Sequence, residues 1–159
     1  MSGEGVDWLP ETFPFTGDWA AYVEVIYRCY LDHFVRNTTY WRGKRVGVRY
    51  EPTTSGKAFT FWHLTCGLDA TGDVNPPDMD RCARIGWVKA LIEADAAKIL
   101  TWEQKRGRDR NVAIALRDFS FVVFLAERRD HMYLLTAYFV QSQGRRDKYR
   151  REYDASKKR

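Results

Sequence analysis

Two short segments carry side chains that could move protons and hold a phosphate. Residues 59–65 read Phe-Thr-Phe-Trp-His-Leu-Thr, so His63 ends an aromatic run typical of a strand. Residues 133–138 read Tyr-Leu-Leu-Thr-Ala-Tyr, and strand alternation places Thr136 and Tyr138 on one face. A proton acceptor, a hydroxyl anchor and a flat ring for a base to stack on are enough for RNA cleavage without a metal, provided that the fold brings them together.

His63 is the strongest candidate for a general base or acid. A histidine has an ordinary pKa of about 6.5, so its ring exchanges protons at neutral pH. The alternative is a structural histidine that is hydrogen-bonded inside a core around Trp62. The basic segment and the Thr-Ala-Tyr run elsewhere in the chain favour the functional interpretation.

Thr136 and Tyr138 belong to an expected strand over residues 132–140. Alternation along that strand also places Met132 and Leu134 on their face. In a functional site the Thr136 hydroxyl would bond a phosphate oxygen, and Tyr138 would stack on a base or donate its phenolic hydrogen. Both residue types are common in strands, so a purely structural role is the competing interpretation.

Cleavage of RNA also needs cations, because the pentacoordinate phosphorane of the transition state carries extra negative charge on its oxygens. The first candidates are Lys105 and Arg110, which belong to a basic segment over residues 103–110 that we expect to be a loop. A charge run is more often a solvated face. The other residues that we predict to bind substrate are Arg45, Arg49, Lys57, Trp62, Arg106 and Arg108. His131, at an expected turn, is a weaker second candidate for proton transfer.

Metal and cofactor chemistry has little support in the sequence. There is no GxGxxG, P-loop lysine or GxSxG motif, and the three cysteines form no CxxC pair. Four acids after His63 could hold a divalent ion, but helix capping and turns explain them more simply. These acids are Asp69, Asp73, Asp78 and Asp80. We therefore expect no cofactor and no metal.

The composition predicts one globular domain. The chain has 159 residues, of which 45% are hydrophobic and 15% aromatic, enough for a core. No apolar run is long enough for a membrane span, and the N-terminus lacks a signal peptide pattern. Scattered cysteines are typical of reduced thiols, so we expect a cytoplasmic protein without membrane partners, although a toxin domain delivered by other machinery would look the same.

The net charge of +5 is unevenly placed. Residues 144–159 hold eight Lys and Arg against three Asp and Glu, which leaves 18 basic and 18 acidic residues in the rest of the chain. The chain has no Lys or Arg before Arg28, so its start is acidic. A basic tail fits attraction to phosphates, and a solvated terminus is the equally simple alternative.

The expected fold is α+β, with N-terminal helices packed on one face of a C-terminal antiparallel β-meander. Asp18 and Asp78 are the expected N-caps of its two helices. The helices cover residues 19–36 and 79–94, and the strands cover 45–51, 57–65, 97–102, 112–116, 119–127 and 132–140. We divide the chain into an irregular lead-in, a single nuclease-like domain and a basic tail, over residues 1–16, 17–143 and 144–159.

A histidine after an early strand, a basic segment and a final meander with Thr-Ala-Tyr resemble the barnase/EndoU/colicin D/RelE-like ribonuclease superfamily, above all its phage-associated branch. The resemblance spans about residues 44–140. It implies a metal-independent endoribonuclease in which a 2′-hydroxyl attacks its own phosphodiester and leaves a 2′,3′-cyclic phosphate. It also implies a toxin that acts on tRNA or mRNA and is held in check by an immunity or antitoxin protein.

Carried over onto this chain, the resemblance assigns His63 as the family histidine, Thr136 as the hydroxyl and Tyr138 as the aromatic residue. Lys105 or Arg110 would be the family cation. The chain departs from EndoU-type sites because no second histidine lies between His63 and the basic segment. The identity of a general acid therefore stays open.

Two non-enzymatic interpretations remain beside the ribonuclease. In the first, Trp62, Tyr138 and the basic tail bind RNA by stacking and charge without cutting it. In the second, the chain is a partner-binding module of a mobile genetic element, and its acidic start masks the basic site. RNA cleavage products separate the enzyme from both, and a complex that resists salt favours the partner-binding module.

Overall fold

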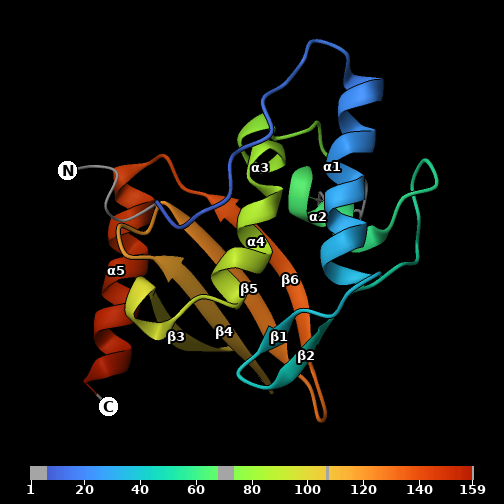
Figure 1. Cartoon of the computed structure of the whole chain (residues 1–159). Helices are drawn as coiled ribbons and strands as arrows, with labels where there is room; N and C mark the ends of the chain where they lie inside the picture. The colour runs from blue at the N-terminus through green and yellow to red at the C-terminus, as the bar shows by residue number, and fades with distance from the viewer. Residues whose placement is uncertain (1–6, 68–73, 107, 159) are drawn as a thin grey trace.

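A computed structural model describes residues 7–67, 74–106 and 108–158 (Figure 1). These ranges contain helices and a six-stranded sheet with the strand order β1-β2-β6-β5-β4-β3, so the predicted α+β class is confirmed. The strands are β1 (Tyr40–Trp41), β2 (Lys44–Gly47), β3 (Ile99–Arg106), β4 (Asp109–Leu116), β5 (Phe121–Glu127) and β6 (Met132–Phe139). Within the described part of the chain, no helix has the length and apolar character to cross a membrane.

The sheet is mixed rather than a simple meander. Strands β3 to β6 are antiparallel neighbours in chain order, as the short connections predict. Strand β2 adds to the other edge of β6 in parallel, with Val46 opposite Met132. Parallel pairing needs a long connection, and here the whole segment between β2 and β6 supplies it. The prediction of a purely antiparallel sheet is therefore wrong.

Two of the helices begin where an aspartate side chain caps them. The helices are α1 (Trp19–Phe34), α2 (Phe59–Thr65), α3 (Met79–Ala83), α4 (Ile85–Ile92), a 3-10 turn η1 (Ala96–Lys98) and α5 (Gln143–Lys157). Asp18 accepts a hydrogen bond from the backbone N–H of Ala21, and Asp78 accepts from two N–H groups of α3. Both predicted caps are confirmed. The expected helix over 79–94 is interrupted at Arg84, which separates α3 from α4.

Residues 59–65 form helix α2, so the predicted strand at this place is wrong. A short apolar run fits a buried strand or a buried helix equally well from periodicity alone. Packing decides the outcome here, because Phe61 is fully buried with its ring 4.8 Å from that of Tyr27 and 5.7 Å from that of Tyr30. The preceding strand is also shorter than predicted, since β2 ends at Gly47.

Two apolar cores lie on the two faces of the sheet. The larger core joins α1, α2 and α4 to one face, through residues such as Ile26, Leu91 and Ile114. The smaller core joins α5 to the other face, where Trp102 and Tyr149 pack together. Helices thus cover both faces (Figure 1), and not one face as predicted. The second cover is α5, which includes most of the predicted basic tail.

A β-bulge in β6 changes which side chains share a face. Thr136 pairs with Phe124 and Leu134 pairs with the next residue of β5, which leaves Leu135 as the extra residue. Met132 and Leu134 consequently point into the larger core, whereas Tyr138 packs against the smaller one. The prediction that Met132 and Leu134 share the face of Thr136 and Tyr138 is wrong, because simple alternation does not hold across a bulge.

Candidate functional site

A cavity of about 490 Å³ lies between α5 and the sheet, and His63, Thr136 and Tyr138 all line it. We call it the His63 cavity. Its floor comes from β3, β4, β5 and β6, one wall from α5, and His63 reaches it from α2. His63 and Thr136 stand 73 positions apart in the chain. The fold therefore brings together the three residues that the sequence singled out.

His63 lies in the last turn of α2, which packs along β6 beyond the end of β2. Its ring centroid is 5.8 Å from that of Phe59, and its imidazole is hydrogen-bonded to the backbone of Leu135. Burial and then the nearby Arg81 guanidinium lower the pKa of His63, and the bond to Leu135 partly offsets this shift. The imidazole is therefore mainly neutral at pH 7, the form that accepts a proton.

Thr136 and Arg81 hold the backbone of His63 in place. The Thr136 hydroxyl donates to the carbonyl oxygen of His63 over 3.2 Å and accepts from Nη2 of Arg81 over 2.9 Å. Arg81 Nη2 also donates to the same carbonyl oxygen. Because Thr136 is only 6% exposed, its hydroxyl serves to fix α2 against β6. The predicted direct bond from Thr136 to a phosphate oxygen has no support in this geometry.

Arg81, which lies beside this site, was missed by the sequence analysis, and Arg145 and Lys148 of α5 were not singled out either. Arg81 is buried in α3, its guanidinium lies 4.9 Å from the ring centroid of Tyr138, and no carboxylate of the described residues forms an ion pair with it. Burial lowers its pKa, as expected for a cation removed from water. One signal was present: Arg81 stands four residues before Ile85, on the apolar stripe of the predicted helix.

Helix α5 contributes the charged wall of the cavity. Arg145, Lys148 and Glu152 line it, at spacings that place them on one helix face. The Arg145 guanidinium lies 5.8 Å from the ring centroid of Tyr138. Glu152 Oε1 accepts hydrogen bonds from Trp102 Nε1 over 3.2 Å and from Gln104 Nε2 over 2.6 Å. The Glu152 carboxylate is thus hydrogen-bonded to side chains of β3. The charges of Arg145 and Lys148 therefore remain available to bind an anion.

The cations that we predicted to be catalytic lie elsewhere. Lys105 and Arg110 face each other across the β3–β4 hairpin, and they alternate with Gln104 and Asn111. Gln104 and Asn111 line the His63 cavity, so strand alternation directs Lys105 and Arg110 to the other face of the sheet. Most of the expected basic loop belongs to the hydrogen-bonded strands β3 and β4, and this regular structure separates Lys105 and Arg110 from His63.

Among the side chains that the structure describes, the remaining predicted substrate-binding residues do not line the His63 cavity either. Lys57 pairs with Glu24 over 2.6 Å. Arg49 lies over the ring of Phe59, and the buried Trp62 donates to the carbonyl oxygen of Thr54. Trp62 therefore offers no free face on which a base could stack.

The other basic candidates lie at the edges of the sheet. Arg45 belongs to β2 and borders a different cavity beside α1. Arg108 is exposed at the start of the β4 hairpin, and Arg106 ends β3, with its side chain outside the described part of the structure. His131 is hydrogen-bonded to Asp130 over 2.7 Å and approaches Gly47, away from the cavity.

The acids that could have held a metal have structural partners where they are described. Asp78 caps α3, and Asp80 is ion-paired with Arg84 and hydrogen-bonded to Gln141. Asp69 and Asp73 lie outside the described residues. Among the described residues, no group of three or more His, Cys, Asp or Glu side chains is placed to hold a metal ion.

The chain matches no family model, no curated protein and no solved structure in comparisons with known proteins. The resemblance to the ribonuclease superfamily therefore stays a prediction.

Proposed function

We propose that the chain is a metal-independent endoribonuclease and that the His63 cavity is its active site. The observation that carries this proposal is the meeting of His63, Tyr138, Arg145 and Lys148 around one cavity. A neutral imidazole, an aromatic ring and two cations are the groups that RNA cleavage needs, since RNA supplies its own nucleophile. The cavity is large enough, at about 490 Å³, for one nucleotide and its phosphate.

In the proposed reaction, the imidazole of His63 takes the proton of a ribose 2′-hydroxyl. The 2′ oxygen then forms a bond to the adjacent phosphorus, and the bond from phosphorus to the 5′ oxygen breaks. The 5′ oxygen takes a proton from water, and the His63 imidazolium later returns its proton to water. The products are a 2′,3′-cyclic phosphate and a free 5′-hydroxyl.

The other residues of the cavity have supporting roles in this proposal. Arg145 and Lys148 neutralise the charge that develops on the phosphoryl oxygens. The ring centroid of Tyr138 lies 4.9 Å from the guanidinium of Arg81 and 5.8 Å from that of Arg145. In this proposal Tyr138 contacts the base or donates its phenolic hydrogen to the substrate. Thr136 and Arg81 act as positioning residues, because their hydrogen bonds hold the backbone carbonyl of His63.

A cleavage assay with total RNA in EDTA tests this function. Wild type should produce fragments with 2′,3′-cyclic phosphate ends, and His63→Ala should not. His131→Ala is the matched control, because His131 is bonded to Asp130 outside the cavity and its loss should leave cleavage unchanged. Equal cleavage by wild type and His63→Ala would reject the assignment of His63.

A non-catalytic RNA-binding module is the second candidate. It is favoured by one observation: among the residues that line the cavity, His63 is the one histidine, so no second imidazole protonates the leaving oxygen. This candidate predicts salt-dependent RNA binding with intact RNA recovered after long incubation. The assay described above distinguishes the two candidates directly.

A further inference from the structure

A second, strongly basic cleft lies at the ends of three β-hairpins. Its volume is about 450 Å³, and it is bordered by β1–β2, β3–β4 and β5–β6. We call it the hairpin cleft. Its cations are Lys44, Arg108, Arg110, Arg128 and Arg129, and its acids are Asp109 and Glu127. Five cations against two acids make it positive, and two of the cations, Arg108 and Arg110, are residues that the sequence predicted to contact substrate.

The cations of the hairpin cleft are exposed and not neutralised. Among the described residues, none of the five forms an ion pair with a carboxylate, whereas Arg36, Lys57, Arg84 and Lys89 elsewhere in the chain each do. Arg128 donates to the carbonyl oxygen of Glu127 and lies over the ring of Tyr133. Like charges gathered in a concave site repel one another and create a potential that attracts an anion.

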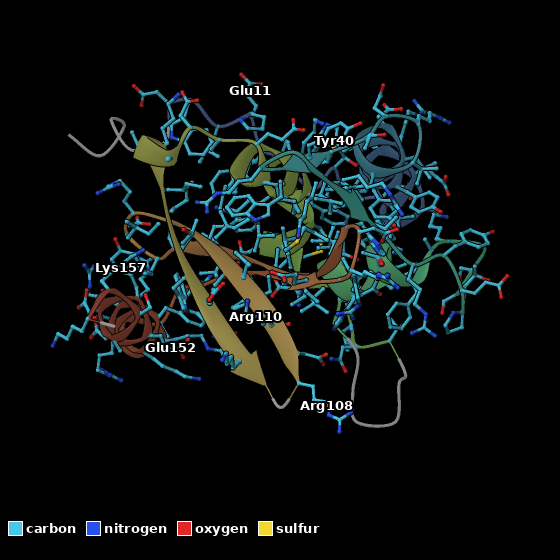
Figure 2. All side chains as sticks on the ribbon, turned by 90° about the horizontal axis from the view of Figure 1, so that it is seen from below. Glu11, Tyr40, Arg108, Arg110, Glu152 and Lys157 are labelled. Carbon is cyan, nitrogen blue, oxygen red and sulfur yellow. The ribbon has the colours of Figure 1, made fainter. Side chains whose placement is uncertain are left out.

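The hairpin cleft and the His63 cavity meet at β4. Arg110 borders the hairpin cleft and its neighbour Asn111 lines the His63 cavity, so the two sites lie on opposite faces of the same strand. Figure 2 shows Arg108 and Arg110 at the β3–β4 hairpin, with Glu152 of α5 to their left and Tyr40 of β1 near the top of the view, far from Arg108. A chain that passes over the end of this hairpin can touch both sites.

We propose that the hairpin cleft binds the sugar-phosphate backbone of a single-stranded RNA and guides it over the β3–β4 hairpin to the His63 cavity. Four of the five cations are arginines, whose planar forks match phosphate oxygens in a bidentate manner. The five cations come from three separate hairpins, which fits the repeated charges of a backbone better than a single anion. The identity of the ligand as RNA rests on the proposed function.

The test measures binding without cleavage. A labelled 2′-O-methyl oligonucleotide of about 20 nucleotides has no free 2′-hydroxyl and stays intact, so fluorescence anisotropy gives its Kd at several salt concentrations. The double variant R128E/R129E should raise the Kd by about tenfold or more and make the salt slope less steep, since each lost phosphate contact removes about 0.7 from it. The control R28E/R36E makes the same charge change in α1 and two residues beyond its end, and it should alter the Kd by less than about threefold.

The outcomes separate this proposal from the proposed function. An equal loss of affinity in both double variants would mean that net charge, and not the cleft, binds RNA. Normal RNA cleavage with an unchanged Kd in R128E/R129E would overturn the proposed RNA binding by the hairpin cleft. The proposed ribonuclease function would stand. If R128E/R129E loses binding and wild type does not cleave RNA, the proposed RNA binding by the hairpin cleft would stand. The proposed ribonuclease function would be overturned.

One further result would reassign the cleft. If wild type does not bind the oligonucleotide, the proposal is overturned. Binding of polyglutamate to wild type but not to R128E/R129E would then assign the hairpin cleft to an acidic protein partner.

Discussion

The His63 cavity and the hairpin cleft lie on opposite faces of one sheet and differ in how their charges are held. In the His63 cavity, His63 and Thr136 are tied by hydrogen bonds to neighbouring elements, and burial has shifted the pKa of His63. In the hairpin cleft, the cations are exposed and without ion pairs among the described residues. Chemistry needs fixed geometry and a tuned pKa, whereas attraction of a polyanion needs only uncompensated charge.

The largest effect that this comparison predicts is on cleavage. His63→Ala should lower kcat/KM by roughly a hundred- to ten-thousand-fold, the usual contribution of a general base. Its Kd for the 2′-O-methyl oligonucleotide should stay within about twofold of wild type, since the hairpin cleft is untouched. Parallel measurement of both constants checks this. An equal loss in both would mean that the two sites are not divided between chemistry and binding.

The second prediction concerns the bonds that fix His63. Thr136→Val should destabilise the fold by about 1–3 kcal/mol, because Arg81 loses an acceptor and the His63 carbonyl loses a donor in a buried place. Thr136→Ser keeps the hydroxyl and is the matched control. Urea unfolding of the two variants gives the difference, and equal stability would show that the hydroxyl network does not hold α2.

The third prediction compares two lysines on opposite faces of the sheet. Lys148→Gln should lower kcat/KM by about tenfold, because Lys148 borders the His63 cavity. This loss is smaller than the one expected on removal of a buried hydrogen-bond donor. Lys105→Gln removes the same charge on the other face and should leave kcat unchanged. If Lys105→Gln lowers kcat more than Lys148→Gln does, Lys105 is the catalytic cation, as the sequence predicted. The His63 cavity would then not be the active site.

The smallest expected effect is on stability as a function of pH. Burial lowers the pKa of His63 and of His33 below the value in the unfolded chain. The unfolded state therefore binds more protons, so stability is complete above about pH 6.5 and falls as the pH drops below it. Urea unfolding at about pH 5.5 and 7.5 should show this, and His63→Gln should reduce the difference. A chain that is more stable at the lower pH would contradict the burial of these histidines.

Parts of the fold and site follow from local sequence. Asp18 and Asp78 predicted two helix starts, because a short acid before an apolar stripe satisfies free N–H groups. The strands of the C-terminal meander followed from apolar runs and short connections. The placement of Thr136 and Tyr138 on one face of their strand could also be predicted locally, because alternation along a strand needs no long-range information.

Tertiary structure alone decided the rest. Residues 59–65 became a helix because Phe61 packs between aromatic rings of α1, a contact that no local pattern specifies. The bulge at Leu135 set which face each residue of β6 presents. The pairing of β3 with β4 carried Lys105 and Arg110 away from His63, and Arg81 reached the site from a distant helix. Local propensity specifies elements, but only packing and register specify which side chains meet.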